Sequence, residues 1–467
     1  MAAASRTAWA EADRPLANRL ADYANRISFS DLDAATVERV KSHLIDTLGC
    51  GIGALDEPPV RICRDVASAS VGGASTLIGA GKKSTPDLAS FANGAALRYY
   101  DLNDSYASPT AGAVHPSDHI APCLAVAESE HASGQDLMVA IALAYEINCR
   151  LLDAFDAATR GWDLPVYSLP AVALAVGKLM KLPPEKLVQA VNLALNDHIP
   201  MGQTRTQTNS DWKGIADAEA ARNAVFAATL ARGGMTGPAP IFEGRKGFFH
   251  LVSTQADVDV AAFGGRGRAF KIHQCGMKAY PAVVYAQTAI EAAIAARRQV
   301  GDLDRIAVIE IATSRRGYEQ TGRDPEKWTP ENRDTADHSL PYITARALFD
   351  GDISNASYAP DKLRDPHILA FMRKITVKED PAFAQLKGNA PSTRLTLTLV
   401  DGKEIVSQVD NLAGFPGQPM RRTDIERKFR SNVGGRWPND RTDAVLQTLW
   451  TLETVDDLSA LMSRLAA

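Results

Sequence analysis

The chain lacks an excess of either charge. Its 51 lysines and arginines nearly balance 55 aspartates and glutamates, so the formal net charge is only -4 over 467 residues. Such a balance creates no global field that would attract nucleic acid or an anionic membrane surface. The partner that we expect is a small molecule.

Long apolar runs are also missing. Polar residues interrupt every apolar stretch well before the roughly 20 residues that a membrane-spanning helix needs. The N-terminal sequence, MAAASRTAWAEADRP, does not contain the unbroken apolar segment of a secretory signal peptide. We therefore expect a cytoplasmic protein that is neither secreted nor inserted into a membrane.

Cysteine is scarce, and its spacing excludes several cofactor classes. The five cysteines form no CxxC pair of the kind that binds zinc or an iron–sulfur cluster. They are Cys50, Cys63, Cys123, Cys149 and Cys275. Their odd number and uneven spacing predict reduced thiols in a cytosolic protein. The sequence 264–267 (GGRG) fits neither GxGxxG nor GxxxxGK(S/T), so we expect no nucleotide loop and no cofactor.

The first part of the chain has the pattern of a helical bundle. Apolar residues recur mostly at helical spacing from residue 14 to about 260, with little of the alternation that marks strands. Residues 30–33 offer caps for one helix, and Ser133 introduces a second. A third helix is expected to start after the prolines at 183–184. The alanine-rich segment 214–232 predicts close contact between helices.

The pattern changes after Lys278. A β-branched run at 305–313 and a short run near 375 predict strands, while alternating segments at 395–399 and 404–409 flank a turn and predict a hairpin. Helices are expected between them, at about 281–298 and 338–350. The fold class is therefore mainly α with a smaller α/β domain. We expect a helical bundle over residues 1–270, completed by about 410–467, and an α+β lid over 275–405, with the sheet confined to about 300–410.

Residues 101–105 (DLNDS) and 115–118 (HPSD) are the segments richest in candidate chemistry. They place acids, hydroxyls and an imidazole on loops between helical patterns, where functional residues are common. Ser117 and Asp118 have an alternative interpretation as caps of a helix at 119–131, and Asp104 as a residue that closes a turn.

A metal site is a third interpretation of these segments. Asp101, Asp104 and His115 are ligand types that bind divalent metals, but no second well-spaced histidine accompanies them. We therefore expect no metal.

Further along the chain, four residues could complete a site. Lys213 precedes the alanine-rich helix, where free N–H groups favour an anion, and Lys278 stands at the predicted domain junction, where pockets are common. Either lysine could instead be solvated on the surface. His338 is equally consistent with a site residue and a satisfied core histidine, and Tyr342 with a packing residue.

Seven segments, in this order, resemble the MmgE/PrpD family, whose members include 2-methylcitrate dehydratase, cis-aconitate decarboxylase and iminodisuccinate epimerase. The resemblance covers nearly the whole chain. The segments are LIDTLGCGIGAL (44–55), DLNDS with HPSDHIAPCLAVAE (101–128), AYEINCRL (144–151), WKGIADAEAARNAVFAATLARGGMTGPAPIFEGRKGF (212–248), KAYPAVVYAQTAIEAA (278–293), TADHSLPYITARALFDG (335–351) and ERKF (426–429).

The resemblance implies a pocket between the two domains, a homodimer and a set of site residues. The matching positions imply that Asp101, Ser105, His115, Lys213, Lys278 and Tyr342 line this pocket. Combined with the motifs above, they give His115, Asp101, Lys278 and Tyr342 as candidate catalytic residues, and Ser105, Lys213 and His338 as candidate substrate-binding residues.

The implied activity is that of a cofactor-independent hydro-lyase. Such an enzyme removes an α-proton from a small polycarboxylate and eliminates water, with cations holding the charge that develops. Epimerisation of a dicarboxylate and decarboxylation of the cis-aconitate type are alternatives, as is an inactive small-acid binding protein. Leu164 and Val283 stand where relatives or the decarboxylase branch have histidines, which disfavours decarboxylation.

Overall fold

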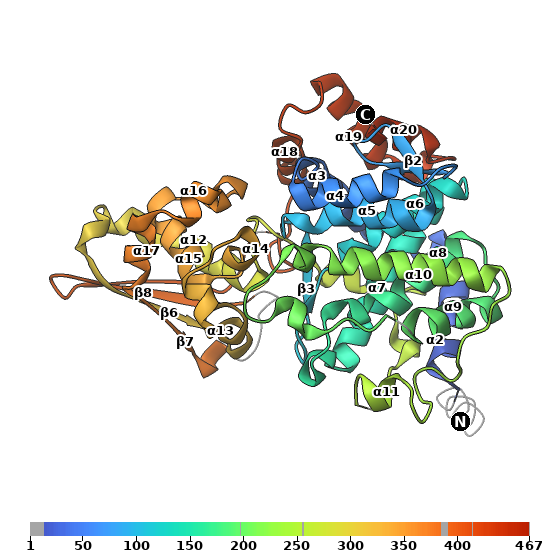
Figure 1. The fold of residues 1–467 in the computed structure, drawn as a ribbon, viewed down its shortest axis with the longest axis horizontal. Coiled ribbons are helices and arrows are strands. Elements are labelled where there is room, and N and C mark those ends of the chain that lie inside the picture. Colours follow the sequence, from blue (N-terminus) through green and yellow to red (C-terminus); the bar gives the residue numbers. More distant parts are fainter. Residues whose placement is uncertain (1–13, 197, 255, 384–390, 413, 467) are drawn as a thin grey trace.

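The computed structural model shows two lobes joined side by side (Figure 1). One lobe consists of helices from the first half of the chain and from its C-terminus, and the other contains a four-stranded sheet.

The structure describes residues 14–196, 198–254, 256–383, 391–412 and 414–466. The start of the N-terminal segment, through residue 13, lies outside the described residues, so the expectation of no signal peptide stays a prediction. No helix in the described part is both long and apolar enough to span a membrane.

The helical domain follows the predicted pattern closely. Asp33 caps α3 by accepting a hydrogen bond from the backbone N–H of Thr36, and Ser133 forms a capping box with Asp136 at the start of α7. Helix α8 is apolar on all sides and is accordingly buried along most of its length. The helices of this part are α2 (Leu16–Arg26), α3 (Ala34–Gly53), α4 (Pro58–Ser68), α5 (Pro86–Tyr99), α6 (Ile120–Ser129), α7 (Gly134–Ala154), α8 (Ser168–Leu179), α9 (Pro184–Asn196), α10 (Ala216–Arg232) and α11 (Phe248–Leu251).

Three C-terminal helices return to this bundle, as Figure 1 shows. They are α18 (Arg422–Val433), α19 (Asn439–Trp450) and α20 (Ser459–Ala466). Helix α18 packs on α3, where a buried ion pair of 2.7 Å joins Lys428 to Asp46. Arg421 takes the N-cap position of α18, and the Asp424 side chain accepts a hydrogen bond from its backbone N–H.

The lid domain is built on a mixed sheet of order β7-β6-β8-β9. Its strands are β6 (Ile306–Thr313), β7 (Ile375–Glu379), β8 (Thr393–Leu399) and β9 (Glu404–Val409). β6 pairs in parallel with β7 and antiparallel with β8, and β8 and β9 form the predicted hairpin. Alternate residues of β8 are buried beneath α12 (Gln287–Val300). The other helices are α13 (Arg315–Thr321), α14 (Arg333–Ala336), α15 (Leu340–Asp350), α16 (Pro360–Leu363) and α17 (Pro366–Met372).

The expectation that sheet is confined to about 300–410 is wrong in detail. β1 (Ser75–Leu77) and β2 (Lys82–Ser84) form a hairpin, and β3 (Asp104–Ala107) lies between β4 (Ala113–Val114) and β5 (Gly276–Met277). Strands of two to four residues are too short to produce a recognisable alternation, so the sequence did not reveal them. The pairing of β3 with β5 has a functional consequence, because it brings the segment before Lys278 beside the DLNDS segment.

Candidate functional site

Asp101 is the centre of the candidate site. It follows α5 with a positive φ of 51°, a left-handed conformation that aspartate tolerates better than most residues and that is common at functional sites. Its Oδ1 lies 2.6 Å from Arg98 Nη1 and 2.5 Å from Lys278 Nζ. Burial alone would raise the pKa of this carboxyl, but Arg98 and Lys278 outweigh it and hold the pKa well below its usual value. Asp101 is therefore a carboxylate clamped between two cations.

His115 contacts this carboxylate from the helical domain. Its Nδ1–H donates to the backbone carbonyl of Asp104 at 2.7 Å, and its Nε2 lies 3.8 Å from Asp101 Oδ1. Burial, and then the charges of Arg98 and Lys278, place the imidazole pKa well below 6.5. His115 is therefore neutral at pH 7, and the donated Nδ1 proton leaves the lone pair on Nε2.

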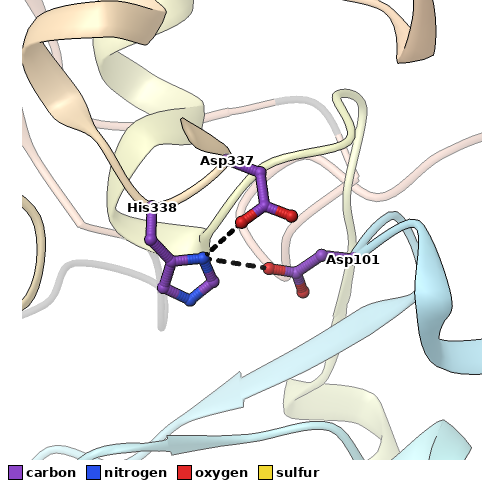
Figure 2. A group of neighbouring side chains, drawn as sticks. All are labelled: Asp101, Asp337 and His338. Carbon is purple, nitrogen blue, oxygen red and sulfur yellow. Dashed lines mark hydrogen bonds and ion pairs between the residues drawn. The ribbon is translucent and has the colours of Figure 1, made fainter. Parts of the chain in front are cut away.

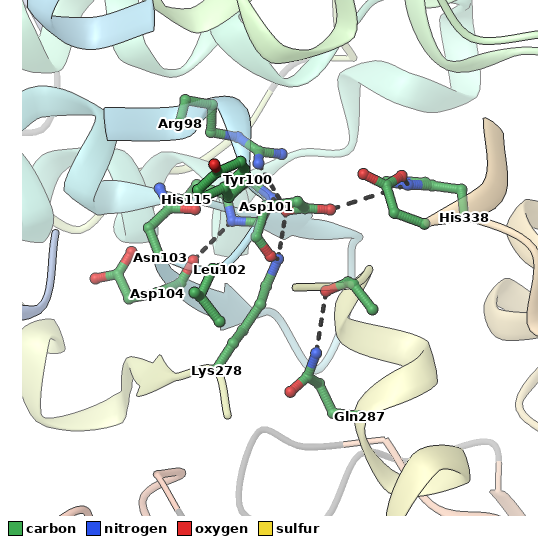
Figure 3. A network of polar contacts seen from close by, with 12 residues as sticks. Arg98, Tyr100, Asp101, Leu102, Asn103, Asp104, His115, Lys278, Gln287 and His338 are labelled. Carbon is green, nitrogen blue, oxygen red and sulfur yellow. Dashed lines mark hydrogen bonds and ion pairs between the residues drawn. The ribbon is translucent and has the colours of Figure 1, made fainter. Parts of the chain in front are cut away.

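His338 approaches the same carboxylate from the lid. It lies between α14 and α15, and Figure 2 shows its Nδ1 directed toward Asp337 and Asp101. The Nδ1–H donates to Asp337 Oδ1 at 2.7 Å and lies 3.9 Å from Asp101 Oδ2. Burial, followed by the charge of Lys213, lowers the imidazole pKa to about 4. In Figure 3, His115 and His338 lie on opposite sides of Asp101.

The two lysines are buried partners of the site's own carboxylates. Lys213 Nζ binds both oxygens of Asp337, at 2.8 and 2.7 Å, and lies 3.5 Å from Asp334. Lys278 Nζ binds Asp101, and burial lowers the pKa of this ammonium to about 8. Both side chains are fully buried, so the sequence-based alternative of solvated surface lysines is wrong.

A cavity of about 940 Å³ at the domain junction gives access to this network. His115, His338 and Arg98 line it, together with the apolar side chains of Leu164 and Val283. Neither Lys213 nor Lys278 is among the residues that line it. A second hollow of about 1020 Å³ lies between α18 and the lid, but neither histidine lines it, so it does not give access to the proton-transfer groups.

Other predicted site residues occupy different surroundings. Ser105 is buried in β3 opposite Gly276 and does not line the cavity. Tyr342 is buried in the lid core, where its hydroxyl donates to the carbonyl of Ser357 at 2.7 Å and its ring lies near Tyr358. The structure thus brings together Asp101, His115, Lys213, Lys278 and His338, and leaves Tyr342 as a packing residue.

The alternative interpretations of the HPSD segment are also resolved. Ser117 and Asp118 do not cap α6; their side chains accept hydrogen bonds from Asn103. Asp104 does not close a turn but lies in β3, where it accepts hydrogen bonds from Tyr145 and from the backbone of Ser117. Both segments are therefore held by a buried polar network, which supports the loop that carries His115.

The described residues contain one group with the spacing of a metal site, formed by Asp101, Asp337 and His338. This group differs from the one predicted from the sequence, because the Asp104 carboxylate binds Tyr145 and His43. Lys278 and Lys213 already neutralise the two carboxylates, so a divalent cation would add charge beside two ammonium groups. The donor set fits a metal-free site better than a metal centre.

Sequence reasoning missed two residues of the network. Arg98 was not considered, although it lies three positions before Asp101 near the end of α5, where a side chain can reach the following turn. Asp337 was missed although it adjoins His338, because nothing in the local pattern shows that Lys213, 124 positions away, is its partner.

Comparison with known proteins agrees with this architecture. The MmgE/PrpD N-terminal domain matches residues 18–261, and the MmgE/PrpD C-terminal domain matches residues 280–452. A 2-methylcitrate dehydratase of Cupriavidus necator is 29% identical over 465 residues, covering 91% of this chain and 91% of that protein. The 2-methylcitrate dehydratase of Escherichia coli is 28% identical, covering 86% and 87%. A human cis-aconitate decarboxylase is 24% identical, covering 92% and 90%. The chain belongs to the MmgE/PrpD family.

Proposed function

We propose that the protein is a lyase that removes water from a small hydroxy-polycarboxylate by acid–base catalysis. One observation carries the proposal: two neutral imidazoles, one from each domain, line a single cavity on opposite sides of Asp101. Removal of a proton next to a carboxylate requires a base whose lone pair is free at working pH. The low pKa values of His115 and His338 provide two such bases.

In the proposed reaction, His115 Nε2 accepts the α-proton of the substrate. The electron pair left on carbon forms the double bond as the C–O bond to the hydroxyl breaks, and the hydroxyl leaves as water with a proton from His338. Bound carboxylates bring negative charge beside His338, which raises the imidazole pKa and lets it carry that proton. Asp337 holds the Nδ1–H of His338 and stabilises the imidazolium.

Cations around the cavity stabilise the negative charge that develops on the substrate. Arg98 lines the cavity directly and is the cation that we assign to the reacting carboxylate. Lys278 and Lys213 act as positioning residues, since they fix and neutralise Asp101 and Asp337 instead of reaching the substrate. The relatives named as dehydratases support elimination, and the apolar Leu164 and Val283 in the cavity wall disfavour decarboxylation.

Epimerisation of a dicarboxylate is the second candidate function. The same arrangement of two imidazoles on opposite sides of one centre suits removal of a proton from one face and its return to the other. A substrate without a β-hydroxyl would then be inverted instead of dehydrated.

One experiment separates these functions. The protein, with a chelator present, is incubated in D₂O with 2-methylcitrate, citrate, cis-aconitate or iminodisuccinate, and the products are followed by NMR. Loss of the hydroxyl with formation of an alkene supports elimination. Deuterium incorporation with inversion supports the epimerase, and carbon dioxide release supports a decarboxylase. Binding of an acid without exchange or turnover would contradict both proposed reactions and support the binding-protein alternative.

A further inference from the structure

One contact between the two domains involves an arginine to which the proposed reaction assigns no role. Arg333 is the first residue of α14, on the side of the lid that faces the helical domain (Figure 1). Its guanidinium carbon lies 4.8 Å from the ring centre of Tyr100 and 5.8 Å from that of Tyr99, at the end of α5. The ring centre of Tyr358, in the lid, is 4.9 Å away. Rings from both domains therefore surround one cation at distances that favour cation–π attraction.

Hydrogen bonds fix the parts of this contact. Arg333 Nη2 donates to Asn355 Oδ1 of the lid at 2.9 Å and to the backbone carbonyl of Tyr100 at 3.4 Å. The Tyr100 hydroxyl in turn donates to Glu57 Oε1 at 2.9 Å and to the carbonyl of Gly53 at 3.1 Å. Tyr100 is therefore held by the helical domain before the lid reaches it, and it offers Arg333 a fixed ring.

Both sides of the contact adjoin the candidate site. Tyr100 directly precedes Asp101, and the carbonyl of Arg333 accepts the backbone N–H of Asp337 at 2.9 Å, in the turn before His338. Across the domain junction, His338 Nδ1 lies 3.9 Å from Asp101 Oδ2. Proton transfer requires hydrogen-bond reach, and a misplacement of about 1 Å can cost roughly 100-fold in rate. The seat of Arg333 on Tyr100 thus determines where His338 stands relative to Asp101.

We infer that Arg333 is a positioning residue that latches the lid onto the helical domain, with His338 and His115 on opposite sides of Asp101. The Lys213–Asp337 ion pair also crosses the junction, but an ammonium is a point charge on a flexible stem, whereas a stacked guanidinium plane also fixes orientation. The catalytic consequence of the latch rests on the proposed function. The latch itself can be measured without turnover.

Hydrogen exchange followed by mass spectrometry tests the latch in the full-length protein. In Arg333→Met, the amides of residues 99–107 and 333–340 should exchange at least about tenfold faster, because these segments lose their contact across the junction. Exchange in α7 and β8, in the cores of the two domains, should not change. Tyr100→Leu removes the ring and should have the same effect. Tyr100→Phe keeps the ring and loses only the hydroxyl, so exchange at 333–340 should stay at the wild-type rate.

Arg422→Met is the matched control. Arg422 lies over the ring of Trp450 at 4.2 Å, but both residues belong to C-terminal helices of the helical domain. This variant removes a cation–π contact of the same kind without touching the junction, and it should leave both segments and the activity unchanged. Unaltered exchange at 333–340 in both Arg333→Met and Tyr100→Leu would overturn the latch. Equally accelerated exchange in β8 would also overturn it, because Arg333 would then stabilise the lid in general.

Steady-state kinetics tests the catalytic consequence. Arg333→Met should lower kcat at least about tenfold and leave KM within about threefold, because the substrate still meets Arg98 while His338 is misaligned. An unchanged kcat despite faster exchange at 333–340 would overturn the positioning role. If the wild type turns over no acid, the proposed function fails, whereas the exchange measurement still decides whether the latch exists.

Discussion

Replacement of Lys213 by methionine tests the buried charge network most strictly. Lys213 and Asp337 are both fully buried and come from different domains, with Nζ 2.7 Å from Oδ2. Methionine keeps most of the volume but leaves the Asp337 carboxylate without its cation. Breaking a buried pair in this way costs about 3–5 kcal/mol, a large part of the roughly 5–15 kcal/mol that stabilises a typical protein.

The double variant Lys213→Met/Asp337→Asn also removes the charge of Asp337 and should recover part of that loss. The recovery is incomplete because buried Asp334, 3.5 Å from Lys213, still loses its cation. The free energy of unfolding is measured from urea titrations followed by circular dichroism, with equal m values as the condition for comparison. Lys378→Met is the control: Lys378 and Glu310 are 2.7 Å apart but both exposed, and the loss should stay below about 1 kcal/mol. A cost below about 1 kcal/mol for Lys213→Met, or a double variant no more stable than the single one, would refute the reasoning.

Three further predictions follow from the same structure. Because the pKa of His338 is about 4 and that of His115 is well below 6.5, both imidazoles lose their protons at low pH. His338 acts as the acid in the proposed reaction, so kcat/KM, which reports the free enzyme, should decline as the pH rises above about 4 and decline further near pH 8, where Lys278 loses its charge; a rise in kcat/KM through pH 6.5 would contradict this. Exhaustive chelation should leave activity unchanged, whereas a loss restored by one specific metal would establish a metal enzyme. Sedimentation velocity should detect a homodimer, and a monomer at micromolar concentration would contradict that expectation.

Local signals predicted most of the fold. The cap at Ser133, the alanine-rich helix α10 and the alternating residues of β8 each determine an element through contacts within one segment. Boundaries were less accurate: the helix expected from about 281 begins at Gln287, because residues 284–286 form a 3₁₀ turn first. The short strand β3 was missed because its stability depends on partners far away in sequence.

The site was predictable in its members but not in its pairings. The motifs and the family resemblance identified Asp101, His115 and both lysines. Lys213 was expected to bind the substrate because only its position before a helix was visible in the sequence, whereas its partner Asp337 lies on the other domain. Tertiary contacts, which one sequence does not reveal, decide whether a lysine faces a ligand or a buried carboxylate.

The most direct test of the proposed chemistry is the rate of deuterium incorporation at the α-carbon of the reactive acid, measured by NMR for the wild type, His115→Ala and His338→Ala. We expect exchange by the wild type and a loss of at least about 100-fold in His115→Ala, the usual contribution of a proton-transfer group. As a control, each folded variant should bind tricarballylate, a tricarboxylic acid without a hydroxyl that can leave, within about threefold of the wild-type affinity. Binding of this unreactive acid needs no proton transfer. Exchange at the wild-type rate in both histidine variants would contradict the assignment of the two imidazoles as the proton-transfer groups.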